Sequence, residues 1–373
     1  MPPHAAPYVP PADAAWETAD PSEAGFDPAR LEAAIAFHTA HETLWPPSMY
    51  LPDGRYIGTA AIGDRPEHAA VVGPVRPRGA PNGMILRGGR IVAEWGDTRR
   101  TDMTFSIAKS YLAVLAGLAQ ADGLIPDLDQ PVAHSIPGPW FAAPRNAGIT
   151  WRHLLQQTSE WEGELWGKPD SADHNRVVGG SSQAKGEARG LFQPGEHFEY
   201  NDVRVNLLAA CLTCVFQRPL PDVLKARIMD PVGASQDWEW HGYETAFVEA
   251  GGHRIRSVSG GGHWGGGMFI GTRDHARMGL LMQRGGTWGE RSLLSAGWIQ
   301  AMFAPSPRND QYGLLWWLAP SFPSATPDSV FARGAGVSLL WIVPSLDLVT
   351  VIRWIDGKQV DGFLGKVLAS LRR

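Results

Sequence analysis

Residues 104–125 form the stretch that most restricts how this chain can fold. In this stretch, TFSIAKSYLAVLAGLAQADGLI, small and apolar residues recur almost all round a helical projection, and Gly123 stands where a helix would end. A helix that is apolar on every side must be covered on every side. The sequence therefore predicts a layered protein with this helix at the centre of its core.

Short apolar segments near both chain ends are typical of β-strands. Residues 83–86 and 90–95 flank Gly88-Gly89 and predict a β-hairpin, and VSLLWIVP and LDLVTVIRWI, separated by Ser345, predict two more antiparallel strands. Helices are expected between and before them: one starting at Asp27-Pro28, a short one capped by Thr150, an apolar one capped by Asp202, and one over residues 274–283.

This order of elements predicts an α+β fold. We expect a sheet domain built from residues 1–120 and 255–373, with helices flanking its antiparallel sheet, and a mainly helical domain over residues 121–254. The long polar loops of residues 158–198 fall in the helical part, and loops of that length inside a compact domain are often functional.

Composition excludes several classes of protein. The chain has 373 residues, 44% of them hydrophobic, and 33 basic against 38 acidic side chains give a net charge of −5, which disfavours nucleic-acid binding. No run of 18 apolar residues predicts a membrane span, and the first residues lack a signal-peptide pattern, so we expect a cytoplasmic protein. The 12 histidines show no metal-ligand spacing, and Cys211 and Cys214, the only cysteines, are interpreted as buried helix residues rather than a redox pair.

Ser106-Ile107-Ala108-Lys109 begins the buried helix and could carry chemistry. Positions i and i+3 share a helix face, so the Lys109 amine can reach the Ser106 hydroxyl and act as the base that a serine nucleophile needs. Free N–H groups at a helix N-terminus would stabilise an acyl oxyanion. The plainer alternative is a capping serine and a solvated lysine. A second copy of the pattern, Ser182 to Lys185, has no apolar helix behind it and is interpreted as a coincidence.

Two further segments could contribute to the same site. Tyr200 stands just before a predicted helix, where its hydroxyl could point into a cleft, although a core tyrosine is the plainer interpretation. Arg333-Gly334-Ala335-Gly336 leads into a strand, and its glycines would let a substrate approach the backbone closely. The G-x-G-x-x-G pattern of residues 260–265 lacks a βαβ context, which disfavours a dinucleotide site.

The order and spacing of these elements resemble those of the serine β-lactamase-like and penicillin-binding-protein-like hydrolases, over about residues 20–373. The resemblance is strongest to class C β-lactamases, family VIII carboxylesterases and 6-aminohexanoate-dimer hydrolases, and the stretches ITWRHLLQQTS and QPGEHFEYND also resemble that group. It implies that Ser106 is acylated, that Lys109 is the base and that Tyr200 moves a proton to the leaving group. The backbone N–H groups of Ser106 and Ala335 would form the oxyanion hole.

Several positions depart from the pattern of these relatives. Asp202 replaces an asparagine that contacts substrate; it either only caps its helix or pairs with Lys109 or a cationic substrate. Arg333 to Gly336 replaces a Lys-Thr-Gly triplet that engages a substrate carboxylate, which argues against penicillin-type substrates. Glu160 replaces a glycine, and we expect the pocket to be walled by these residues and their neighbours: Asp202, Glu160, Trp161, Trp166, Gly334 and Gly336.

The sequence thus predicts a cofactor-free serine hydrolase that cleaves an ester or amide bond in a small molecule through an acyl-Ser106 intermediate. A β-lactamase or D,D-peptidase is the first alternative, and a non-enzymatic acylatable sensor or inactive relative is the second. Nothing in the residue pattern indicates an oligomeric state, a metal, or a nucleic-acid or membrane partner.

Overall fold

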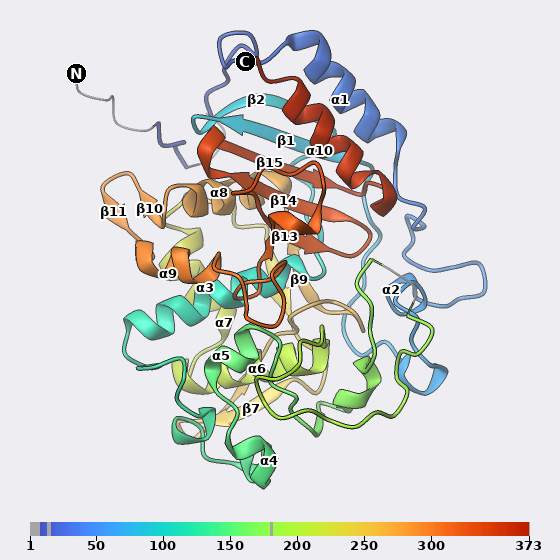
Figure 1. Ribbon diagram of the computed structural model, residues 1–373, viewed down its shortest axis with the longest axis vertical. Helices are drawn as coiled ribbons and strands as arrows, with labels where there is room; N and C mark the ends of the chain where they lie inside the picture. The colour runs from blue at the N-terminus through green and yellow to red at the C-terminus, as the bar shows by residue number, and fades with distance from the viewer. Residues whose placement is uncertain (1–7, 13–15, 180–181, 373) are drawn as a thin grey trace.

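Six antiparallel strands form the main sheet of the computed structural model, which describes residues 8–12, 16–179 and 182–372. The strand order is β12-β13-β14-β15-β1-β2. Figure 1 shows this sheet in the upper half of the molecule, with most of the helical segments of the middle of the chain below it. The fold class is α+β, as the order of elements predicted.

The strands of this sheet come from two distant parts of the chain, and pairing of β1 with β15 joins those parts. The bounds are β1 Asn82–Arg87, β2 Arg90–Trp95, β12 Trp317–Leu318, β13 Val330–Gly334, β14 Ser338–Val343 and β15 Leu348–Arg353. The hairpin around Gly88 and Gly89 and the antiparallel pair on either side of Ser345 are both confirmed. The predicted domain boundaries at residues 120 and 254 stay a prediction.

The other strands form smaller sheets. A three-stranded sheet has the order β3-β9-β6, and three more pairs of strands form hairpins. Their bounds are β3 Asp102–Met103, β4 Glu164–Leu165, β5 Lys168–Pro169, β6 Glu239–His241, β7 Phe247–Ala250, β8 His253–Arg256, β9 Gly267–Ile270, β10 Thr287–Trp288 and β11 Arg291–Ser292.

Helices cover both faces of the main sheet. On one face, α1 (Pro28–Ala40) and α10 (Val360–Ala369) pack together (Figure 1). His38 of α1 accepts a hydrogen bond from the Trp95 indole of β2 at 2.9 Å. On the other face lies α8 (Thr272–Gln283), at a distance that only a glycine allows. A Cβ atom on Gly279 would lie 2.6 Å from side-chain atoms of β14 and β15.

Helix α3 (Ile107–Ala121) is the central helix that the sequence predicted. Its residues are buried without a break from Ile107 to Ala119, and it contacts both β13 and α6 (Asp202–Phe216). The remaining helices are α2 Ile57–Ala60, α4 Pro144–Ala147, α5 Trp151–Leu155, α7 Leu220–Leu224, α9 Ala296–Met302 and the short helical turns Pro66–His68, Val132–His134, Pro139–Phe141, Asp170–Asp173, Lys225–Met229, Ala319–Ser321, Pro344–Leu346 and Gly357–Gln359.

Helix α6 begins differently from the prediction. Asn201, not Asp202, is its N-cap: the Asn201 side-chain oxygen accepts hydrogen bonds from the backbone N–H groups of Val203 and Arg204 at 3.1 and 3.2 Å. Asp202 is therefore the first helical residue, and its carboxylate is free to contact other elements. Cys211 and Cys214 both lie on α6 with free thiols, the first buried and the second half-buried.

Among the described residues, no single helix is long and apolar enough to cross a membrane. The bent pair formed by α6 and residues Leu220–Met229 passes that test of length and composition only when both helices are taken together.

Replacing the N-cap of α1 should lower stability without touching any cavity residue. The Asp27 carboxylate accepts a hydrogen bond from Arg30 N at 3.1 Å, so Asp27→Ala should reduce the free energy of unfolding by about 1 kcal/mol. Asp27→Asn keeps an acceptor and should lose far less. Urea denaturation of the three proteins measures the difference, and equal losses in both variants would contradict the capping role.

Candidate active site

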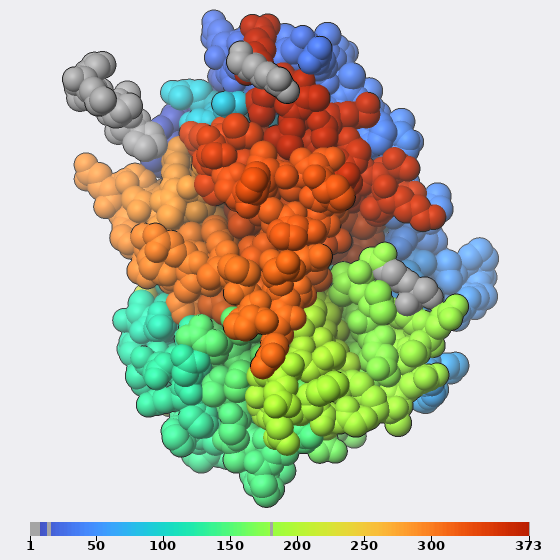
Figure 2. Space-filling view, in the orientation of Figure 1, coloured from blue at the N-terminus to red at the C-terminus, as the bar shows by residue number. Residues whose placement is uncertain are grey.

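A cavity of about 460 Å³ brings together segments from across the chain. Figure 2 shows the blue, green and red segments that line it meeting on the right of the molecule. Its lining residues are Thr43, Trp45, Ala61, Ile62, Ser106, Arg176, Val177, Val178, Gly179, Ser182, Tyr200, Trp317, Arg333, Gly334, Ala335, Gly336, Val337, Gly357, Lys358 and Val360. Ser106, Tyr200 and residues 333–336, which the sequence singled out separately, therefore face one space.

Ser106 and Lys109 make the contact that their spacing predicted. Ser106 directly precedes α3, and the Lys109 ammonium donates a hydrogen bond to its hydroxyl oxygen over 2.7 Å. Only 1% of the Lys109 side chain is exposed, so the alternative of a solvated lysine is wrong. The Ser106 side chain also makes no capping hydrogen bond to α3, which leaves its hydroxyl free for other chemistry.

Tyr200 lies over the same lysine. The Lys109 nitrogen is 4.8 Å from the centre of the Tyr200 ring, and the Arg176 guanidinium carbon is 5.0 Å from it. The ring packs at 5.6 Å from that of Trp317, another residue of the cavity. Two cations and an aromatic neighbour thus fix the orientation of Tyr200 beside the Ser106-Lys109 pair.

The end of β13 approaches the start of α3 closely. A Cβ atom on Gly334 would lie 2.2 Å from the Thr104 carbonyl oxygen, so only glycine permits this approach. Ala335 follows directly and borders the same cavity as Ser106. Ser106 and Ala335, whose N–H groups the family resemblance assigned to an oxyanion hole, thus line one cavity.

Asp202 pairs with Lys109, which was one of its two predicted roles. Its Oδ1 atom lies 2.6 Å from the Lys109 nitrogen, and its Oδ2 atom lies 3.2 Å from Arg176 Nη1 and 3.3 Å from His263 Nδ1. Burial by itself would raise the pKa of the Asp202 carboxyl, but the charges of Arg176 and Lys109 outweigh burial and hold that pKa far below its usual range. Asp202 does not line the cavity, which argues against contact with a cationic substrate.

The prediction that Glu160, Trp161 and Trp166 wall the pocket is wrong. None of them lines the cavity. The Trp161 indole donates to the Trp140 carbonyl at 2.7 Å, and the Trp166 indole donates to the Phe247 carbonyl at 3.2 Å. Both rings are therefore anchored within the helical part of the protein.

Glu160 forms ion pairs that could not be predicted from the sequence. Its carboxylate lies 2.7 Å from Arg189 and 2.8 Å from Arg204. Burial would raise the pKa of Glu160, but the hydrogen bonds and charges of the two arginines lower it to about 2. A carboxylate in place of the relatives' glycine thus ties its loop to α6 and to residue 189.

The glycine-rich segment of residues 260–265 packs against the Lys109-Asp202 ion pair. A Cβ atom on Gly261 would lie 2.8 Å from Asp202 Oδ2 and 3.0 Å from the Lys109 nitrogen. The segment can cover this ion pair only because it lacks side chains there. It also carries His263 to Asp202, a contact that the sequence analysis missed because the scattered histidines show no spacing pattern.

The second Ser-x-x-Lys pattern is not a second copy of the first contact. Ser182 borders the cavity, but its hydroxyl exchanges hydrogen bonds with the Val177 backbone. Lys185 is buried and pairs with the carboxylates of Asp64 and Asp173, the latter at 2.9 Å. The pattern is a coincidence of spacing, as predicted, although its lysine has a structural role.

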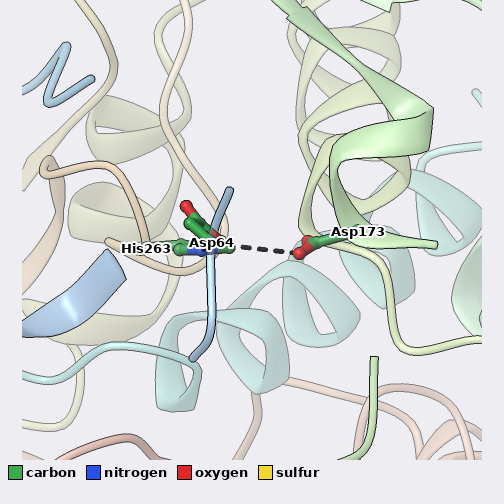
Figure 3. A group of neighbouring side chains, drawn as sticks. All are labelled: Asp64, Asp173 and His263. Atoms are coloured by element: carbon green, nitrogen blue, oxygen red, sulfur yellow. Dashed lines mark hydrogen bonds and ion pairs between the residues drawn. The ribbon is translucent and has the colours of Figure 1, made fainter. Parts of the chain in front are cut away.

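One group of potential metal ligands occurs in the described part of the chain. Asp64, Asp173 and His263 each bring a ligand atom within 4.8 Å of the others, and Figure 3 shows the His263 imidazole pointing toward Asp173 across a dashed contact. The Lys185 ammonium contacts both carboxylates and supplies the cation that they require. The group is an ion-pair cluster in which Lys185 is a shared cation of the two carboxylates.

Fold and site together define the class of β-lactamase- and transpeptidase-like proteins: an antiparallel sheet flanked by helices, with a Ser-x-x-Lys pair at the start of the buried helix. The sequence profile of the family described as Beta-lactamase matches residues 84–354, more than half of the chain. The chain belongs to the Beta-lactamase family. None of the curated proteins compared matches it.

Solved structures share this fold at low sequence identity. A protein described as a β-lactamase from Bacteroides dorei has a TM-score of 0.58 at 16% identity, over 78% of this chain and 93% of that one. A protein described as a 6-aminohexanoate-dimer hydrolase from Bacillus anthracis has a TM-score of 0.55 at 16% identity, over 78% of this chain and 77% of that one. EstCE1, described as a hydrolase with promiscuous acyltransferase activity, has a TM-score of 0.54 at 14% identity, over 79% of this chain and 93% of that one.

A methyl group on residue 261 should disturb the ion pair behind the cavity. Gly261→Ala must displace Asp202 or Lys109, so we expect kcat/KM for an ester substrate to fall about 10- to 100-fold. Gly148→Ala is the matched control, because a Cβ atom there meets no atom within 4 Å. Steady-state kinetics of both variants test this, and parental activity in Gly261→Ala would contradict it.

Proposed function

We propose that this protein is a serine hydrolase that cleaves an ester or amide bond through an acyl-Ser106 intermediate. The single observation that carries the proposal is the 2.7 Å contact between the Lys109 nitrogen and the Ser106 hydroxyl at the cavity. A buried lysine in contact with a serine hydroxyl is the pairing that activates a serine nucleophile when the amine is neutral.

The proposed reaction uses the residues around this contact in two stages. The neutral Lys109 amine takes the Ser106 proton while the hydroxyl oxygen attacks the substrate carbonyl carbon, and the Ser106 and Ala335 N–H groups bind the oxyanion. The leaving group then departs with a proton delivered by way of Tyr200. Water attacks the acyl group in the second stage, and the Ser106 oxygen regains its proton as the acid is released.

The charge of the cavity supports a neutral or anionic substrate. Arg176, Arg333 and Lys358 all line it, and no carboxylate does so among the described residues. The Arg333 guanidinium lies between the rings of Trp317 and Phe322, at 4.8 and 4.6 Å from their centres. Burial lowers the pKa of Arg333 to about 10, which still leaves it charged at neutral pH.

Arg333 also supports a second candidate function. It stands where relatives carry the lysine of the Lys-Thr-Gly triplet, and it gives the cavity a cation that could engage the carboxylate of a β-lactam. A panel of neutral esters, linear amides, acidic esters and a chromogenic cephalosporin separates these substrate classes. Hydrolysis of the cephalosporin alone would favour a β-lactamase, and acylation without turnover of any member would favour a sensor.

Loss of the proposed nucleophile should abolish both turnover and covalent labelling. We expect Ser106→Ala to reduce ester hydrolysis by at least about 10³-fold, because removal of a nucleophile removes the acylation route. A fluorophosphonate should add once to the parent protein and not to the variant, as measured by intact mass. Ser182→Ala is the matched control and should be labelled like the parent. Labelling at Ser182 would overturn the assignment.

Activity should be lost when Lys109, the proposed base, is removed or replaced by arginine. Lys109→Ala is expected to cost about as much activity as Ser106→Ala, because the two residues act as a unit. Lys109→Arg keeps a basic side chain beside Asp202, but a guanidinium stays protonated and cannot accept the serine proton. Substantial kcat/KM in the arginine variant would show that another group is the base.

A further inference from the structure

A buried network of charges lies behind the cavity. Three carboxylates are in direct ion-pair contact with four basic side chains; the members are Asp64, Asp173, Asp202, Lys109, Arg176, Lys185 and His263. They come from the loop after α2, the Asp170–Asp173 turn and the loop after it, α3, α6 and the glycine-rich segment. Only Lys109 among them contacts the Ser106 hydroxyl.

His263 lies at the centre of this network, and both of its ring nitrogens face carboxylates. Its Nε2 atom is 2.8 Å from Asp64 Oδ1, and its Nδ1 atom is 3.3 Å from Asp202 Oδ2 and 3.6 Å from Asp173 Oδ1. A neutral imidazole has only one N–H and would direct the lone pair of its other nitrogen at a carboxylate. Two carboxylates beside Nδ1 and one beside Nε2 therefore favour the imidazolium form.

The surroundings of the ring agree with that form. The side chain is 1% exposed and stacks on Trp264, with ring centres 3.9 Å apart. Burial alone would lower the pKa of His263, but the carboxylates of Asp64 and Asp173 and the hydrogen bonds to Asp173 and Asp202 raise it to about 9.

The network balances without a charge on Lys109. Asp64, Asp173 and Asp202 carry three negative charges, and Arg176, Lys185 and the His263 imidazolium carry three positive charges. A base must lose its proton to act, and an unshared carboxylate at 2.6 Å would hold Lys109 as an ammonium ion. Since Arg176 and His263 share the Asp202 carboxylate, its charge is offset by groups other than Lys109.

We propose that His263 is a positioning residue for the reaction: as an imidazolium it holds Asp202 in place and offsets its charge, so that Lys109 can take the Ser106 proton at neutral pH. This inference rests on the proposed function of Ser106 and Lys109. His263 does not line the cavity, so it acts on Lys109 from a distance, by its contact with Asp202 and by its positive charge.

Other charged groups near the network do not replace His263. Lys168 lies 4.9 Å from the centre of the Trp264 ring, and its ammonium donates to the His68 and Ala70 carbonyls. Arg176 is divided between Asp173 and Asp202. The groups that face Lys109 are Asp202, the Ser106 hydroxyl and the Tyr200 ring.

The test compares pH–rate profiles of two variants with opposite expected shifts. His263→Gln removes a positive charge, which favours the protonated form of the base and should move the acid limb of kcat/KM up by about one pH unit. Activity at pH 7 should then fall and recover at higher pH. Asp202→Asn removes a negative charge and should move the acid limb down by about one unit or more. A merely structural defect would lower activity at every pH.

Three controls make each outcome decisive. His253→Gln, at an exposed residue of β8, should keep the parental profile. The double variant His263→Gln/Asp202→Asn removes one charge of each sign, so it should fold even where His263→Gln alone does not. Its acid limb should lie above that of Asp202→Asn. Fluorophosphonate labelling of Ser106 in the parent establishes the proposed function separately.

The outcomes separate the two proposals. If the parent is not labelled at Ser106, the proposed function fails. If the parent is labelled but His263→Gln keeps the parental acid limb, or the double variant matches Asp202→Asn, the role of His263 is overturned.

Discussion

The buried amine of Lys109 is the constraint on which the rest of this structure depends. An amine that is 1% exposed needs polar partners whether or not it is protonated, because an unpaired buried polar group is strongly disfavoured. Asp202 and Ser106 supply them at 2.6 and 2.7 Å. To bring these groups together, α3 must be covered on all sides, α6 must be capped by Asn201 rather than Asp202, and Gly261 must lack a side chain.

Ion pairs also hold the long loops of residues 158–179 and 182–198, which contain little regular structure. The cluster around Glu160 joins one end of this region to α6 through Arg204, and the network around Asp173 joins another part to the loop that carries Asp64. Removal of one member of a buried pair typically costs about 3–5 kcal/mol, because the partner charge is left uncompensated. These clusters thus fix the cavity wall without an extensive sheet.

Two departures from the pattern of the family's relatives place charges at the site. Asp202 adds a negative charge beside Lys109, where relatives carry a neutral amide, and it is compensated behind the cavity by Arg176 and His263. Arg333 keeps a positive charge at the cavity itself, between two aromatic rings. Cations therefore line the cavity, while the Asp202 carboxylate beside Lys109 lies outside its lining.

The sequence by itself determined α3, the two hairpins and the Ser106-Lys109 contact, because each depends on local periodicity or on the i to i+3 spacing of one helix. Only the tertiary structure decided where Asp202, Glu160 and His263 point. Glu160 pairs with Arg204, 44 residues away in the sequence, and His263 pairs with Asp64, 199 residues away. The direction of a charged side chain depends on which distant charges the fold brings to it, and no local pattern records that.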